Sequence, residues 1–170
     1  MKALLIITLL LSTIAIDQTK VDLTNSKEML IGEWKFVKVI DQAGNEVKQI
    51  KRNLKVPNLE PITINASGPD IIVKADGTYT KVFTPKNSDT GNWYIQSKNE
   101  ILYQMVIPIN SRQGRMIIKT QEIFPDKKWE KDGKGNFLDG SIDTITELTK
   151  TTMKVVYEKD YVLVYAKILK

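Results

Sequence analysis

The sequence contains neither cysteine nor histidine, although the chain is 170 residues long. Without cysteine there is no disulfide, no thiolate zinc site and no thiol nucleophile. Without histidine there is no Ser-His-Asp triad and no imidazole metal ligand, and the side chain that most often moves protons near neutral pH is missing. We therefore expect a protein that is not an enzyme and that carries no metal and no cofactor.

One route to catalysis remains, a pair of carboxylates of the kind that glycosidases use. Most acidic residues of this chain stand in turn sequences or beside lysines, where they act as turn formers or solvated charges: Asp76, Asp89, Asp126, Asp132 and Asp160. No pair of acids is singled out by its spacing. A hydrolase is accordingly the third and weakest of the functions considered.

Long apolar runs are also scarce, and the one present lies at the N-terminus. Residues 3–11 follow a lysine and precede the small-residue site at 13–15, which is the arrangement of a signal peptide. An uncleaved anchor is the alternative, but a spanning helix needs about 20 apolar residues. We expect residues 1–15 to be a signal peptide cleaved near Ala15, followed by a single domain over 16–170. That domain would be periplasmic or secreted, with no transmembrane span.

The net charge of +5 comes almost wholly from lysines that are scattered along the chain. Basic and aromatic residues do not interleave along any one element, so nucleic acid is not an expected partner. The densest basic group is Lys48, Lys51, Arg52 and Lys55. It indicates either an anionic partner or, since lysine is normally exposed, a solvated flank beside a loop.

Short apolar segments separated by turn residues predict an antiparallel sheet. The clearest hairpin joins residues 71–74 to residues 78–83 through Asp76-Gly77, a pair that suits a tight turn. A second hairpin pairs residues 92–96 with residues 101–107. Further strands are expected at residues 34–40, 62–64, 115–124, 144–148, 153–158 and 161–168.

Helix is expected only before the first strand, at residues 23–30. Three prolines interrupt residues 47–69, and residues 127–140 are rich in glycine and charge, so both segments are predicted as loops. Eight to ten antiparallel strands joined by hairpins fit a barrel or a sandwich. Closure removes exposed sheet edges and slightly favours the barrel.

Four short motifs follow one another along the chain: residues 31–36, residues 75–79, residues 91–94 with 99–102, and residues 145–149 with 152–155. In this order they resemble the lipocalin-like families of exported bacterial proteins, particularly those of Bacteroidetes. The resemblance covers residues 23–168. It implies an all-β fold, an antiparallel up-and-down lipocalin-like β-barrel of eight to ten strands with a short N-terminal helical turn.

The resemblance also implies a structural floor for the barrel. Gly32 and Trp34 form a Gly-x-Trp motif at the start of the first strand, and in lipocalins this tryptophan closes one end. Better-studied lipocalins cover the tryptophan with an arginine late in the chain. Here the last strand offers only Lys167, whose stem can cover an indole but lacks the flat guanidinium.

Strand alternation places several aromatic and apolar side chains on common faces. If these faces point inward, they would line an apolar chamber with hydroxyl and ammonium groups, the usual make-up of a small-molecule site. The candidate ligand-binding residues are Tyr79, Lys81, Phe83, Trp93, Ile95, Tyr103 and Met105. The alternative is a filled core with no chamber, because small barrels are often simply packed.

The sequence therefore predicts an exported, non-catalytic protein that binds a small apolar or amphipathic ligand inside a barrel. The alternative is a solid barrel that acts as a protein- or envelope-interaction module through its long loops, residues 47–69 and 127–140. The ligand and any protein partner remain unidentified at this stage.

Overall fold

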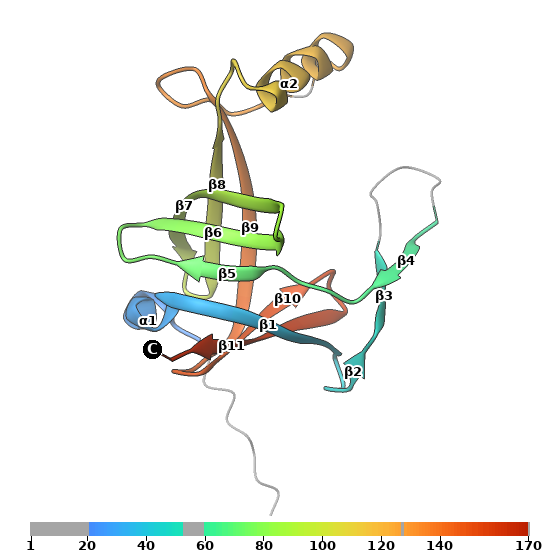
Figure 1. Ribbon diagram of the computed structural model, residues 1–170, viewed down its shortest axis with the longest axis vertical. Helices are drawn as coiled ribbons and strands as arrows, with labels where there is room; N and C mark the ends of the chain where they lie inside the picture. Colours follow the sequence, from blue (N-terminus) through green and yellow to red (C-terminus); the bar gives the residue numbers. More distant parts are fainter. Residues whose placement is uncertain (1–20, 53–59, 127, 170) are drawn as a thin grey trace, which may run out of the picture.

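The computed structural model describes residues 21–52, 60–126 and 128–169, so the expected signal peptide at residues 1–15 lies outside the described residues. Figure 1 shows the elements along the chain. They are α1 (Leu23–Leu30), β1 (Gly32–Asp41), β2 (Glu46–Val47), β3 (Gln49–Arg52), β4 (Ile62–Asn65), β5 (Asp70–Val73), β6 (Thr78–Thr84), β7 (Asn87–Ser97), β8 (Glu100–Ile107), α2 (Arg112–Ile123), β9 (Phe137–Leu148), β10 (Thr152–Tyr157) and β11 (Tyr161–Ile168).

Eight of these strands form one closed antiparallel barrel. The pairing order is β1-β5-β6-β7-β8-β9-β10-β11, and β11 pairs with β1 to complete the circle. Each barrel strand thus pairs with the next barrel strand along the chain, which is the up-and-down order of lipocalin-like barrels. The expected fold class is confirmed. The short β2 adds to β1 outside this circle, and β3 and β4 form a separate two-stranded sheet.

A bulge in β1 changes which of its side chains face the interior. Trp34 is buried, but Val37 is exposed and Val39 is buried again. The pairing with β11 shifts between Phe36 and Lys38, which inserts one residue into the alternation. Strict alternation from Trp34 would have turned Val39 outward.

Both expected hairpins are present. Gly77 has φ +86° in the turn between β5 and β6, where the Asp76 carboxylate accepts a hydrogen bond of 2.9 Å from the Thr78 N–H. A positive φ suits glycine, which has no Cβ to clash. In the second hairpin Trp93 lies opposite Tyr103, as the two-strand register predicts.

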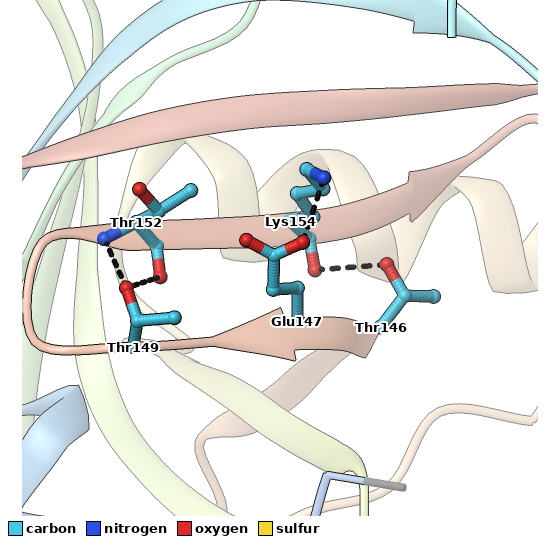
Figure 2. A network of polar contacts seen from close by, with 5 residues as sticks. All are labelled: Thr146, Glu147, Thr149, Thr152 and Lys154. Carbon is cyan, nitrogen blue, oxygen red and sulfur yellow. Dashed lines mark hydrogen bonds and ion pairs between the residues drawn. The ribbon is translucent and has the colours of Figure 1, made fainter. Parts of the chain in front are cut away.

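The turn between β9 and β10 is held by side chains of the last predicted motif (Figure 2). The Thr149 hydroxyl accepts a hydrogen bond of 2.9 Å from the Thr152 N–H. Behind the turn, Lys154 Nζ lies 2.7 Å from the Glu147 carboxylate across the two strands. These contacts stabilise the hairpin that leads into the closing strand β11.

Helix α1 covers one end of the barrel. Leu23 and Leu30 at its two ends are fully buried in the main core, and the Leu23 N–H donates to the Lys98 carbonyl at 2.6 Å. The last carbonyls of a helix lack intrahelical partners. Here Trp34 Nε1 donates to the Leu30 carbonyl at 2.8 Å and Lys167 Nζ donates to the Met29 carbonyl at 2.7 Å.

Two extensions rise from the barrel away from α1 (Figure 1). The β3–β4 sheet packs on the barrel through Ile50, which is 1% exposed. Strands β8 and β9 continue past the barrel as a two-stranded arm, residues 104–140, with α2 at its tip. The arm has its own small core of Ile107, Ile117 and Phe137.

Helix α2 corrects the expectation of a strand at residues 115–124 and of no helix after the first strand. The Ser111 hydroxyl caps α2 by accepting a hydrogen bond of 2.9 Å from the Gly114 N–H. The run Met116-Ile117-Ile118 suits a strand by itself, but in α2 it places Ile117 in the small core of the arm and leaves Met116 exposed. Within the described residues neither helix is long and apolar enough to cross a membrane.

Both predicted loops also contain strands. Residues 137–140 of the expected loop at 127–140 belong to β9, where they pair with residues 104–107 of β8. In residues 47–69 the strand at 62–64 is confirmed as part of β4, and its partner β3 was missed. Only one residue of β3, Ile50, is buried, so its sequence carries little strand signal.

Replacing Gly91 with alanine tests the close approach of β7 and β8. A Cβ at Gly91 would lie 2.2 Å from the Gln104 carbonyl oxygen, which belongs to the backbone and cannot turn aside. We expect Gly91→Ala to lower the free energy of unfolding by about 1–3 kcal/mol, measured by chemical denaturation. Gly133→Ala is the control, since no atom lies within 4 Å of its Cβ. Equal stability of the two variants would contradict this packing.

Candidate functional site

Four of the predicted ligand-binding side chains lie together inside the barrel. Tyr79 and Lys81 come from β6, Trp93 from β7 and Tyr103 from β8, and all four are buried. The rings of Tyr79 and Tyr103 pack edge to face with centroids 4.8 Å apart. Alternation along three adjacent strands therefore brings these side chains to one interior wall.

Lys81 is the buried charge of this wall. Its Nζ lies 2.9 Å from Asp143 Oδ2 and 3.9 Å from the centroid of the Tyr103 ring. A buried ammonium needs a counter-charge, and Asp143 provides it together with the face of an aromatic ring. We call Tyr79, Lys81, Tyr103 and Asp143 the Lys81 cluster.

Asp143 was missed by the sequence reading. Its signal was available, because it stands two residues before the buried Ile145 and so shares that inward face. The predicted strand begins at Thr144, whereas β9 begins at Phe137. Acids in turn sequences are expected to be solvated charges. Asp143 instead lies within a strand, β9, opposite Ile101 of β8.

The Tyr103 hydroxyl is buried and has no hydrogen-bond partner among the described residues. The two buried tryptophans of the main core are satisfied, since Trp34 Nε1 donates to the Leu30 carbonyl and Trp93 Nε1 donates to the Lys74 carbonyl at 3.0 Å. A buried polar group without a partner costs free energy and calls for an explanation. It marks the one place in the Lys81 cluster where an incoming polar atom would gain a hydrogen bond.

Solvent reaches the interior face beside Tyr103. Ser141 lies opposite Tyr103 in the β8–β9 ladder and therefore shares its face, yet Ser141 is exposed. Asp139, which lies opposite Met105 at the next inward position, is exposed as well. The wall is thus exposed to solvent on the β9 side, where it continues into the arm, and we call this place the opening.

Acidic side chains outnumber Lys81 around this opening. Burial, followed by the nearby charges of Asp89, Asp139 and Asp143, raises the pKa of Tyr79 to about 12. Burial and then Asp143 raise the pKa of Tyr103 well above its ordinary value. Within the described residues no three acids are grouped closely enough to hold a metal ion. Since Asp143 already balances Lys81, the opening carries negative charge.

The other three predicted ligand-binding residues are not part of the Lys81 cluster. Ile95 is half-buried and packs on the main core, and Met105 packs on the core of the arm. Phe83 is 46% exposed and does not join the chamber wall. Its β6–β7 pairing shifts between Val82 and Thr84, so the inward alternation from Tyr79 and Lys81 ends before it.

The predicted floor residues lie together at the α1 end. Lys167 Nζ is 5.0 Å from the centroid of the Trp34 ring, and burial lowers the pKa of Lys167. Gly32 has φ +141°, and a Cβ there would lie 2.5 Å from Lys167 Cε. A cavity of about 600 Å³ opens beside these residues, lined by Gly32, Val73, Lys167 and Ile168 among others, and none of the seven predicted ligand-binding residues lines it.

Two solved structures from Bacteroides have similar folds. A lipocalin-like protein from Bacteroides uniformis ATCC 8492 is 12% identical, with 82% of this chain and 99% of that chain covered and a TM-score of 0.42. A protein from Bacteroides eggerthii DSM 20697 is 14% identical, with 81% and 98% covered and a TM-score of 0.41. No family model and no curated protein matches this chain. The class of lipocalin-like β-barrel is defined by this chain's own closed strand order.

A double-mutant cycle on Lys81→Met and Asp143→Asn measures the buried ion pair. Each single change leaves a partly desolvated charge without its partner, so we expect a coupling energy of about 1–3 kcal/mol from urea unfolding. The control cycle uses Lys48 and Glu46, whose side chains are 84% and 41% exposed. Its coupling should stay below about 0.5 kcal/mol, and equal coupling in both cycles would refute a special role for the buried pair.

Alkaline pH is expected to destabilise the fold through its buried tyrosines. An unfolded tyrosine loses its proton near pH 10, whereas Tyr79 and Tyr103 keep theirs at higher pH when folded. Their contribution is therefore complete below about pH 10 and falls as pH rises toward the folded pKa. Above about pH 10, the free energy of unfolding of the Tyr103→Phe variant should fall by about 1.4 kcal/mol less per pH unit than that of the parent chain. Urea unfolding at a series of pH values measures this difference. Identical slopes for both chains would contradict the burial of this hydroxyl.

Proposed function

We propose that this chain is an exported, non-catalytic lipocalin-like protein that binds one small amphipathic molecule through the opening of its barrel. The observation that carries the proposal is the buried Tyr103 hydroxyl, which lacks a partner among the described residues and lies beside solvent-reached Ser141. A ligand oxygen or nitrogen at this point would supply the missing hydrogen bond.

The surroundings of Tyr103 favour a ligand with a polar end and an apolar body. The polar end would meet the Tyr103 hydroxyl and the Lys81–Asp143 pair. Met105 is the next side chain on the same face of β8, is only partly buried, and would contact the apolar body. Sites of this kind are mostly apolar, with a few polar groups that fix the orientation of the ligand.

Charge at the opening selects the type of polar end. Asp89 and Asp139 add negative charge near a lysine that Asp143 already neutralises. A carboxylate would therefore be repelled, whereas a hydroxyl, a carbonyl or an amine would be accepted. We propose a neutral or cationic amphiphile in preference to a fatty acid.

Export and the absence of catalysis remain part of the proposal. Export rests on residues 1–15, which lie outside the described residues, and mass spectrometry of the chain recovered from its host tests it, since a retained Met1 would exclude cleavage. The proposed binding needs no group that forms or breaks bonds. Its energy would come from apolar surface removed from water and from the one hydrogen bond to Tyr103.

Tyr103→Phe tests the binding site with opposite expected effects on stability and on affinity. Removing an unpaired buried hydroxyl should leave the free energy of unfolding unchanged or raise it by about 1–3 kcal/mol. The same change should weaken ligand binding about tenfold, since one hydrogen bond is lost. The probes are a monoacylglycerol, an alkylamine and a fatty acid of equal chain length, titrated by tryptophan fluorescence and calorimetry.

Tyr94→Phe is the matched control, because Tyr94 is 48% exposed on the outer face of β7. It should change neither stability nor affinity. Binding of the fatty acid alone would overturn the charge argument. No binding of any probe, or equal binding by the Tyr103→Phe variant, would count against the site itself.

A further inference from the structure

The arm carries a helical face that the barrel does not use. Helix α2 lies at the tip of the arm, away from α1 and the closed end (Figure 1). It has no counterpart among the expected elements, since residues 115–124 were read as a strand. Its orientation and its exposed side chains therefore need an explanation of their own.

One face of α2 is fixed against the arm. Gly114 and Ile117 are buried, and Ile117 packs with Ile107 and Phe137. A Cβ at Gly114 would lie 2.3 Å from the Pro108 carbonyl oxygen, so the helix touches the arm's backbone at this point. With this face held, the opposite face of α2 must point into solvent.

The outward face of α2 combines large apolar side chains with cations. Met116, Ile123 and Phe124 are 60%, 70% and 60% exposed. Positions 116 and 123 are two helical turns apart and lie on one side of the helix, where residues 112, 115 and 119 also fall. The outward face is therefore made of Arg112, Arg115, Met116, Lys119 and Ile123, with Phe124 at its end.

The cations of this face are not used within the protein. Among the described residues Arg112, Arg115 and Lys119 form no ion pair, and Arg115 donates only to the Asn110 carbonyl. The nearest acid on the helix is Glu122, which lies on the flank beside Arg115. In the segment after α2 the exposed Lys128 and Lys131 are balanced by the exposed Asp126 and Glu130, so the positive charge of the tip comes from α2 itself.

We infer that the outward face of α2 binds the surface of an anionic lipid bilayer. The cations would meet lipid phosphates, while Met116, Ile123 and Phe124 would enter the boundary between headgroups and acyl chains. A protein partner is less well matched, since protein interfaces place charge at the rim around a continuous apolar centre. Here Met116 and Ile123 form an apolar stripe with cations along one side of it, and helices that lie on membranes place apolar side chains and cations next to each other in this way.

This inference goes beyond the proposed function and stands on α2 alone. The proposed membrane surface and the proposed ligand site nevertheless lie on the same side of the molecule, because the arm that carries α2 extends from the side of the barrel near Tyr103. A bilayer held by α2 would lie on the side of the molecule away from the floor formed by Trp34 and Lys167. The Lys81 cluster takes no part in this contact.

Vesicle co-sedimentation of the folded protein tests the inference. The parent chain should bind vesicles of equal parts phosphatidylglycerol and phosphatidylcholine, and should bind pure phosphatidylcholine far more weakly. Arg112→Ala combined with Lys119→Ala should weaken binding about 25-fold, about fivefold for each charge, and added salt should weaken it further. Met116→Ser combined with Ile123→Ser keeps every charge and should also weaken binding.

The matched control removes two exposed lysines at the closed end, Lys98→Ala with Lys150→Ala, and should bind like the parent chain. Unfolding curves establish that each variant is folded, and Tyr103→Phe should retain full vesicle binding even if it loses its ligand. No binding of the parent chain to anionic vesicles would overturn the inference. Equal losses for the α2 and control pairs would overturn it too, as would recovery of a stoichiometric protein partner through α2 without vesicle binding.

Discussion

The pairing of β1 with β11 is the constraint on which the rest of the structure depends. It joins the first and last strands of the barrel from Glu33 opposite Ile168 to Asp41 opposite Tyr161. The same two strands supply Trp34 and Lys167, which donate hydrogen bonds to the last carbonyls of α1. The two strands that close the barrel therefore also hold α1, the helix that covers one end of the barrel. Every inward side chain takes its orientation from that closed circle.

The barrel interior is well packed, but it contains one buried tyrosine hydroxyl without a hydrogen-bond partner among the described residues. Large side chains such as Trp34, Tyr165 and Met153 fill the barrel near α1. On the open side the wall holds a buried ammonium, a carboxylate and two tyrosine side chains, and the buried Tyr103 hydroxyl has no hydrogen-bond partner among the described residues. Phenylalanine at this position would pack as well without the cost of a buried polar group. The hydroxyl therefore contributes nothing to folding, and this is the reason that the proposed ligand contact is placed at Tyr103.

The arm adds the surface of α2 to the molecule without altering the packing of the barrel. The ladder of β8 and β9 continues outward, and a small core around Ile117 and Phe137 fixes α2 to its tip. This core is distinct from that of the barrel. A change in the outward face of α2 can therefore alter binding there while leaving the barrel's stability and the Lys81 cluster untouched.

The sequence by itself determined an antiparallel all-β chain, its two central hairpins and the shared face of Tyr79, Lys81, Trp93 and Tyr103, because turn residues and two-residue alternation are local signals. These local signals left a barrel and a sandwich open, and the pairing of β1 with β11 is what closes the sheet into a barrel. Only the tertiary structure decided which side chains face inward beyond a bulge, where α2 forms and which residue pairs with Lys81. A bulge returned Val39 to the core, another shift left Phe83 outside, and residues 112–123 formed a helix whose Ile117 packs in the core of the arm. Asp143 acquired its role only when β9 was placed beside β8, since the partner of a buried charge is set by contacts between segments far apart in the chain.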